Sequence, residues 1–236
     1  MMEPIVFLPG MMCDARLFGP QLEALSRERS VMVAPTSVGE RIEEMASNVL
    51  ASAPAKFALV GLSLGGIVAM EVYRRAPERI TRLALLDTNP VSETPERAAA
   101  REPQIVKVKA GQLRAVMRDE MKPQYLAHGP NRQAVLNLCM EMAEDLGPDV
   151  FIRQSRALQR RRDQQSTLRK IKCPALVLCG QGDQLCPPER HQFMAQMIPY
   201  SELKIIEGAG HLPTLEQPEL TLESLRGWLG QPLILQ

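Results

Sequence analysis

A serine between glycines is the residue of this sequence best placed to do chemistry. Ser63 lies in Gly61-Leu62-Ser63-Leu64-Gly65, after an apolar run that ends at Val60 and before the apolar run Ile67–Met70. This pattern is typical of a strand, a sharp turn and a helix, in which the turn exposes the serine hydroxyl to an acyl carbon. Glycines on both sides remove the collisions of so tight a turn. The pattern predicts nucleophilic acyl transfer; the alternative is a glycine-rich turn with an idle serine.

A serine nucleophile needs a base, and the sequence contains three histidines. His211 follows Glu207-Gly208-Ala209-Gly210, just after the last predicted strand, at the sheet edge where α/β sites assemble. His191 lies inside a predicted helix and is expected at the surface. His128 precedes Gly129-Pro130 and is expected in a loop, although it could face the site. The base is therefore predicted to be His211.

The base needs an acid to orient it, and two aspartates follow predicted strands. Asp183 ends the turn Gly180-Gln181-Gly182-Asp183, and Asp87 ends the strand before the long gap in the strand pattern. The chain order serine, acid, histidine is that of a known hydrolase arrangement, which favours Asp183. Asp87 stays the competitor and is expected to bond backbone amides of the loop that follows it.

An oxyanion needs donors, which backbone amides can supply. The residue after the nucleophile, Leu64, is one predicted donor, and Met11 in the loop after the first strand is the other. Pro9-Gly10 permits the unusual backbone of that loop, unless it is an ordinary turn. Asp14 is expected to cap the helix that carries Leu17 or to hold the loop in place.

These residues need a scaffold, and the apolar pattern predicts a doubly wound, mainly parallel α/β sheet of about six strands. The strands are short continuous apolar runs, which are typical of strands covered on both faces. The predicted strands are Ile5–Leu8, Val31–Ala34, Ala58–Val60, Leu83–Leu86, Ala175–Cys179 and Leu203–Ile206. The predicted helices that alternate with them are Leu17–Arg27, Glu40–Ala53, Leu64–Ala76, Pro188–Met197 and Pro218–Leu229.

A long segment between Asp87 and Cys173 contains no good strand. Its patterns predict helices at Pro95–Ala110, Gly111–Met121, Arg132–Asp145 and Asp149–Arg161, with a break at Gly147-Pro148. Such an insertion after the fourth strand predicts a helical cap over a site, rather than a layer that only adds stability. The expected division is a core of residues 1–88 and 171–236 and a cap of residues 89–170.

Composition and charge exclude several classes of protein. The formal net charge of +1 gives no basic field for nucleic acid, and Arg160-Arg161-Arg162 next to Asp163 indicates a solvated helix face. No apolar run is long enough to span a membrane, and no secretory signal precedes the first strand. The five cysteines have no metal-like spacing and are expected as free thiols, so a cytoplasmic protein without a metal is predicted.

Four segments together resemble the α/β-hydrolase superfamily, above all its small capped esterases. They are Phe7-Leu8-Pro9-Gly10-Met11, Gly61-Leu62-Ser63-Leu64-Gly65-Gly66, Gly180-Gln181-Gly182-Asp183, and Gly208-Ala209-Gly210-His211-Leu212-Pro213 with Glu216-Gln217-Pro218-Glu219 after it. The resemblance implies a cofactor-free serine hydrolase that works through an acyl-enzyme. Carried over by position, Ser63 is the nucleophile, His211 the base and Asp183 the acid.

The sequence departs from the superfamily's pattern in three places. Pro9-Gly10 stands where many members have His-Gly, and Thr36-Ser37-Val38-Gly39 replaces a longer glycine-rich loop. The chain also begins almost at the first parallel strand, so the two antiparallel strands of larger members are not expected. A serine nucleophile argues against epoxide hydrolase and dehalogenase chemistry, for which this fold uses an aspartate.

The substrate is predicted less sharply than the reaction. Thirteen methionines suggest an adaptable apolar pocket, so a small-molecule ester with an apolar group is expected, although the methionines could simply pack the cap. No convergent pair of arginines indicates an anionic substrate. Alternatives are a lactone or carbon–carbon bond hydrolase, an acyltransferase, and a ligand-binding protein of the same fold. Predicted substrate contacts are Met12, Met117, Met121, His128 and Leu212.

Overall fold

The protein is described by a computed structural model that covers residues 2–121 and 124–233. Within this part of the chain, six parallel strands form one sheet in the order β2-β1-β3-β4-β5-β6. The strands are β1 Ile5–Leu8, β2 Val31–Val33, β3 Phe57–Leu62, β4 Ile80–Leu86, β5 Ala175–Gly180 and β6 Ser201–Ile206. The predicted doubly wound parallel sheet is confirmed. From β1 the chain first adds β2 on one side and then β3 to β6 on the other, and helices cover both faces of the sheet.

Strand ends differ from the apolar pattern where polar residues find partners. β4 starts at Ile80 and includes Arg82, which is buried but bonds Glu3 and the backbone oxygen of Trp228. β6 starts at Ser201 because this edge strand pairs with β5 on one side only and tolerates half-exposed polar side chains. The first residues of β4 and β6 form neither an alternating pattern nor a continuous apolar run. The apolar pattern of the sequence therefore did not predict them.

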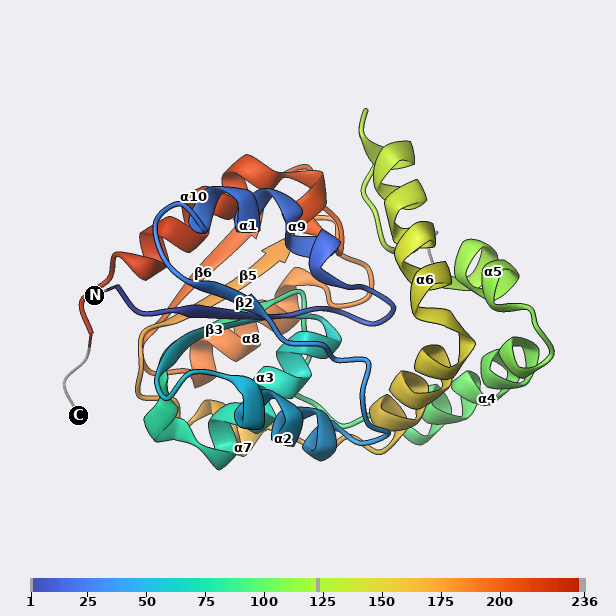
Figure 1. Ribbon diagram of the computed structural model, residues 1–236, viewed down its shortest axis with the longest axis horizontal. Helices are drawn as coiled ribbons and strands as arrows, with labels where there is room; N and C mark the ends of the chain where they lie inside the picture. Colours follow the sequence, from blue (N-terminus) through green and yellow to red (C-terminus); the bar gives the residue numbers. More distant parts are fainter. Residues whose placement is uncertain (1, 122–123, 234–236) are drawn as a thin grey trace.

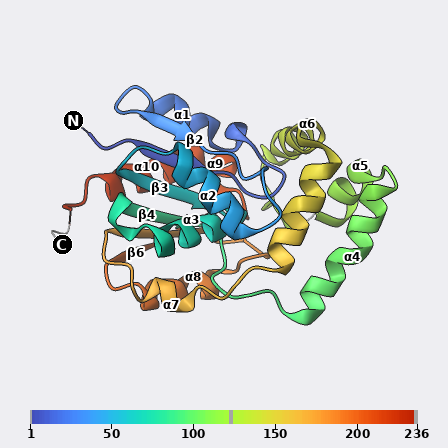
Figure 2. The same ribbon diagram turned by 60° about the horizontal axis from the view of Figure 1, so that its bottom comes forward.

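Helices cover both faces of the sheet, as Figures 1 and 2 show. One face carries η1 Ala15–Phe18, α1 Gly19–Leu25, α9 Pro213–Glu216 and α10 Pro218–Leu229. The other carries α2 Ile42–Ser52, α3 Leu64–Arg75, α7 Gln165–Leu168 and α8 Pro188–Met197, and the short η2 Pro77–Arg79 leads into β4. Asp14 caps η1 by accepting the Arg16 amide at 2.9 Å, as expected of it.

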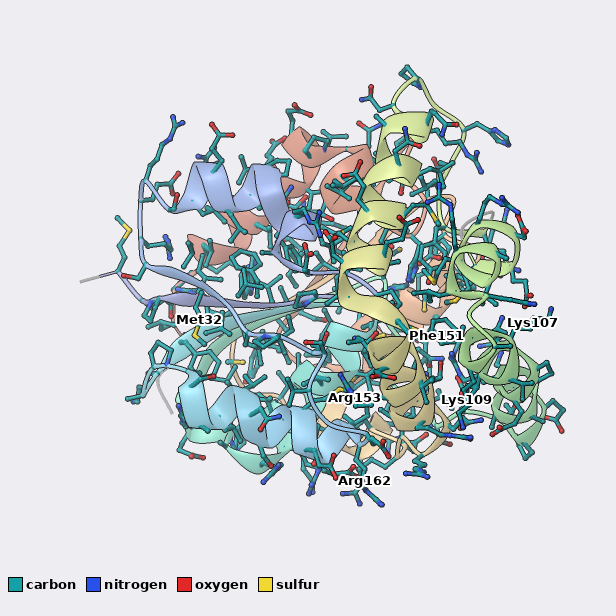
Figure 3. The ribbon with its side chains drawn as sticks, turned by 45° about the vertical axis from the view of Figure 1, so that its right-hand side comes forward. Met32, Lys107, Lys109, Phe151, Arg153 and Arg162 are labelled. Carbon is teal, nitrogen blue, oxygen red and sulfur yellow. The ribbon has the colours of Figure 1, made fainter. Side chains whose placement is uncertain are left out.

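The helical insertion, here residues 95–159, lies beyond the sheet at the end opposite the two chain termini (Figure 1). It contains α4 Pro95–Lys109, α5 Leu113–Ala115, the π-helix η3 Val116–Met121 and α6 Arg132–Gln159. α6 is kinked at Gly147, whose φ of 81° and ψ of 175° interrupt the helix at the predicted break. Figure 3 looks onto the insertion, with the buried Phe151 on the second half of α6. No helix of the described residues has the length and hydropathy needed to cross a bilayer.

Candidate active site

Ser63 occupies a strained turn between β3 and α3. Its φ of 55° and ψ of −115° lie in a region that non-glycine residues rarely adopt. The Ser63 amide donates to the backbone oxygen of Leu86 at 2.9 Å, and the Thr88 hydroxyl donates to the Ser63 oxygen at 2.7 Å. A Cβ on Gly65 would lie 1.9 Å from the Leu8 oxygen, so only glycine lets α3 begin this close to β1. The turn is therefore held from several strands at once.

The structure brings the three predicted side chains into one series of hydrogen bonds. His211 Nε2 lies 2.9 Å from Ser63 Oγ, and His211 Nδ1 lies 2.8 Å from Asp183 Oδ2. Asp183 Oδ1 accepts the amides of Leu185 and Cys186. Burial would raise the pKa of Asp183, but His211 and these amides outweigh it and hold the pKa below the usual range. A charged Asp183 can therefore fix the orientation and tautomer of the imidazole.

Asp87 lies beside this series but does not contact His211. The sequence predicted that Asp87 bonds amides of the loop that follows it. Instead, its Oδ1 accepts the amide of Gly180, at the end of β5, at 2.9 Å. The carboxyl group is fully buried, and it lies close enough to Asp183 for a hydrogen bond between the two side chains. Burial and the charge of Asp183 raise the pKa of Asp87 well above its ordinary value. The raised pKa favours the protonated form of Asp87, and it is Asp183 that bonds His211 Nδ1 directly.

The amides of Met11 and Leu64 lie next to Ser63, and both residues line the same cavity. A Cβ on Gly10 would be 3.4 Å from the Ser63 Cβ, which shows how closely the Met11 loop approaches the serine. Leu64 is the first residue of α3, whose first amides have no acceptor within the helix. Within the described residues the Met11 amide donates no hydrogen bond. Met11 and Leu64 therefore remain candidates for the two oxyanion donors.

The Met11 loop is held by a side chain that sequence reasoning missed. Gln154, on α6 of the insertion, is fully buried, and its Oε1 accepts the Met12 amide at 2.8 Å. Its Nε2 donates to the Thr36 oxygen at 3.1 Å, while the Thr36 hydroxyl donates to the Pro9 oxygen at 3.1 Å. Met12 has a φ of 55°, which needs such support. No local motif marks Gln154, because it lies 142 residues from its partner.

The loop of His211 is held by a second part of the insertion. The His211 amide donates to the backbone oxygen of Tyr125 at 2.6 Å, and the two rings meet edge to face at 5.5 Å. Glu216 accepts the amides of Gly210 and Ala127, which joins the loop to the insertion again. Burial raises the pKa of Glu216 although these amides oppose it. Glu216, five residues after His211, thus helps to fix the loop that carries the imidazole.

His191 is buried, and the prediction that it lies at the surface is wrong. Its Nε2 accepts the Thr88 amide at 3.0 Å, and its exposed fraction is 0%. Burial lowers its pKa to about 4, so the ring is neutral. The face of α8 that carries His191 packs on the sheet, and Thr88 in turn holds the backbone of Ser63. The helix pattern of α8 was too weakly amphipathic to show which face is buried.

A cavity of about 340 Å³ opens at Ser63 and His211, between the core and the insertion. Of the five predicted substrate contacts, Met121 lines it, and the other four lie elsewhere. Met12 is turned into the core by its positive φ, and Met117 and Leu212 are buried in packing. His128 is exposed at a turn outside the cavity. Packing among α helices, which the sequence does not show, decided these placements.

The wall of the cavity is more polar than the sequence predicted. It includes three arginines and a carboxylate that come from the insertion and the segments at its two ends: Glu93, Arg97, Arg101 and Arg161. Arg97 and Arg101 are four residues apart on α4 and so share a helix face, which is the sequence signal that could have identified them. Arg161 is distant from both in the sequence and is brought beside them only by the tertiary structure.

One group of potential metal ligands overlaps this site. Single ligand atoms of Asp183, Cys186 and His211 lie within 4.8 Å of one another. However, Asp183 and His211 already bond each other, and burial strongly raises the pKa of the Cys186 thiol. Two of the three groups are therefore already engaged in the series with Ser63, which does not favour a resident metal. All five cysteines are buried.

Comparisons with known proteins identify the family of this chain. A family model for the alpha/beta hydrolase family matches residues 5–224. The chain is 28% identical over 193 residues to a pimeloyl-[acyl-carrier protein] methyl ester esterase of Aromatoleum aromaticum, covering 77% of each protein. It is 24% identical over 234 residues to a putative carbamate hydrolase of Yersinia enterocolitica, covering 92% of this chain and 84% of the relative.

Solved structures give the same result for the fold. A thermophilic esterase of Thermogutta terrifontis, solved with malate bound, superposes with a TM-score of 0.88 at 29% identity, covering 96% of this chain and 89% of that one. An enol-lactonase of Burkholderia xenovorans gives 0.87 at 22% identity, with 98% and 92% covered, and shows the shared fold alone. Since the family model spans nearly the whole chain and the parallel sheet carries Ser63 at its expected turn, the chain belongs to the alpha/beta hydrolase family.

Proposed function

We propose that this protein is a serine hydrolase that cleaves carboxylic ester bonds of small substrates through an acyl-enzyme, without a cofactor. The observation that carries the proposal is the unbroken series Ser63, His211 and Asp183, with Ser63 opening into a cavity. Several relatives are named as esterases, which supports the same class of reaction.

The geometry gives each group a role. His211 Nε2 takes the hydroxyl proton as Ser63 Oγ bonds to the ester carbon, and the carbonyl oxygen becomes an oxyanion. The amides of Met11 and Leu64 donate to that oxyanion. When the intermediate collapses, the bond to the alcohol breaks and the alcohol takes the proton from His211. A water molecule then repeats the two steps and releases the acid and free Ser63.

The helical insertion serves in this proposal as a cap over the cavity. Its residues Arg101, Met121 and Tyr125 form one wall, while Ser63 and His211 belong to the core side. A cavity of about 340 Å³ fits a small acyl or alcohol group. Excluding bulk water from this space strengthens the electrostatic interactions inside it.

Ester hydrolysis by the Ser63→Ala variant tests the proposal. Loss of the nucleophile should lower kcat on nitrophenyl esters by about a millionfold, and a fluorophosphonate probe should label the wild type at Ser63 only. Ser224→Ala, which changes a half-buried serine of α10 whose hydroxyl bonds the Leu220 oxygen, is the matched control and should behave as the wild type. Undiminished hydrolysis by Ser63→Ala, or a wild type that neither cleaves esters nor reacts with the probe, would refute the proposal.

A further inference from the structure

Three arginines meet a single carboxylate in the wall of the cavity. Arg101 binds Glu93 through two hydrogen bonds, Nε to Oε2 at 2.6 Å and Nη2 to Oε1 at 2.9 Å. Arg161 Nη1 lies 3.5 Å from Glu93 Oε1, and its Nε donates to the Val91 oxygen. Arg97 adds a third positive charge near Glu93, and its guanidinium makes no hydrogen bond to the described residues. One acidic group therefore faces the arginine cluster, defined as Arg97, Arg101 and Arg161.

The inner part of this cluster is shielded from water. The side chain of Arg161 is 6% exposed and that of Glu93 is 3% exposed, while Arg101 is 19% exposed. Burial lowers the pKa of Arg161, and the charges of Arg101 and Arg97 lower it further against the opposing effect of Glu93. Positive charges in excess of their counterions are costly to bury. A second anion in the cavity would offset this cost.

The other acidic residue of the cavity lining does not supply that anion. Glu120 Oε1 is bound by Lys107 Nζ at 2.6 Å. Figure 3 shows Lys107 at the outer side of the insertion, so this pair lies at the rim. Among the described residues of the lining, the positive charge of the arginine cluster is thus offset only by Glu93.

The arginine cluster belongs to the same space as Ser63. Arg161 is close enough to Cys186 to act on it electrostatically, and the Cys186 amide donates to Asp183. Arg101 acts in the same way on Tyr125, whose ring lies against that of His211. Ser63, Cys186 and Tyr125 all line one cavity of about 340 Å³. One small molecule can therefore contact the arginine cluster and the serine together.

We propose that the arginine cluster recognises a carboxylate of the substrate, so that the preferred esters carry an anionic group away from the bond that is cleaved. Guanidinium groups match carboxylates through paired, charge-assisted hydrogen bonds, and Arg97 has its donors free for this. The proposal rests on the proposed ester hydrolysis, because it assigns the other end of the same substrate. It also replaces the sequence prediction of a mainly apolar substrate.

Matched pairs of esters test this preference. One pair is the mono-nitrophenyl ester of adipic acid and the nitrophenyl ester in which an isopropyl group replaces the free carboxylate. A second pair places the carboxylate, or its neutral isostere, in the alcohol part of a butyrate ester. The wild type should show a kcat/KM at least about tenfold higher for the anionic member of one pair.

Substitutions at Arg97 make the test specific to charge. Arg97 is exposed and bonds none of the described residues through its guanidinium, so its variants should fold. The preference for the anionic ester should persist in Arg97→Lys, fall in Arg97→Gln and fall further in Arg97→Glu. Arg114→Glu is the matched control, because it reverses an exposed charge of the same insertion outside the cavity and should keep the wild-type ratio.

Direct binding separates this proposal from the proposed function. Adipate should bind the Ser63→Ala variant in calorimetry, and Arg97→Glu in that background should weaken binding at least about tenfold. Equal kcat/KM within both ester pairs, or a preference that Arg97→Glu leaves unchanged, overturns the inference while ester hydrolysis stands. Arginine-dependent adipate binding without hydrolysis of any ester would refute the proposed function and leave standing only the part of the inference that assigns carboxylate binding to the arginine cluster.

Discussion

At the residue scale, two neighbouring aspartates follow strands β4 and β5, and only one of them orients His211. Asp183 accepts two backbone amides and stays charged beside His211, at 2.8 Å. Asp87 accepts one amide and is fully buried, and burial and the charge of Asp183 raise its pKa, which favours the protonated form. Two adjacent carboxyl groups cannot both ionise cheaply, so their environments separate their roles.

The two aspartates should therefore respond differently to the same substitution. Asp183→Asn removes the charge that fixes the His211 tautomer and should lower kcat by about ten-thousandfold. Asp87→Asn replaces a neutral carboxyl group with a neutral amide and should lower kcat less than about tenfold. Steady-state kinetics on a nitrophenyl ester compares them, with circular dichroism to check folding. Equal losses in the two variants would contradict this assignment of charge.

At the element scale, the insertion positions loops of the core. Gln154 on α6 holds the Met11 loop through Met12 and Thr36, and Tyr125 holds the His211 loop through its backbone oxygen. The predicted cap is therefore tied to both sides of the serine by buried hydrogen bonds. A change in the insertion should reach the reaction through these contacts.

Gln154→Leu tests that connection. Without the side-chain oxygen, the Met12 amide loses its buried acceptor, and the Met11 amide should shift from the oxyanion; kcat should fall about tenfold to a hundredfold, with a smaller change in KM. Gln159→Leu is the control, because Gln159 joins α6 to α4 away from the Met11 loop. If both variants lose kcat equally, Gln154 has only a structural role.

At the scale of the whole molecule, buried residues of the core support the site from below. His191 lies under Thr88, which holds the turn of Ser63, and its ring is kept neutral by burial. The unfolded chain exposes the same ring to water, where it protonates at its ordinary pKa of 6.5. Stability thus depends on pH through a residue that does no chemistry.

The free energy of unfolding should fall as pH drops from 6.5 towards 4, because His191 binds a proton in the unfolded state but stays neutral in the folded state. Urea unfolding of wild type and His191→Gln isolates this effect, since a glutamine oxygen can still accept the Thr88 amide. Between pH 7 and pH 5, the free energy of unfolding of the wild type should fall by about 2 kcal/mol more than that of His191→Gln. Asp87 and Glu216, whose raised pKa values act in the opposite direction, are present in both proteins and cancel. A constant difference would contradict the prediction.

The sequence by itself determined the parallel sheet, the turn of Ser63, and the placement of His211 and Asp183 at the sheet edge beside it. These features follow from local patterns: apolar runs fix buried strands, glycines fix the turn, and residues after parallel strands meet at one edge. The break in α6 at Gly147 was likewise visible as a glycine before a proline.

Only the tertiary structure decided what lines the cavity and what supports the site. Arg161 lies beside Arg97 and Arg101, and Gln154 bonds Met12, although these residues are far apart in the sequence and no local motif links them. Burial also shifts pKa values: packing lowers the pKa of His191, and packing together with Asp183 raises the pKa of Asp87. Both shifts depend on neighbours far apart along the chain.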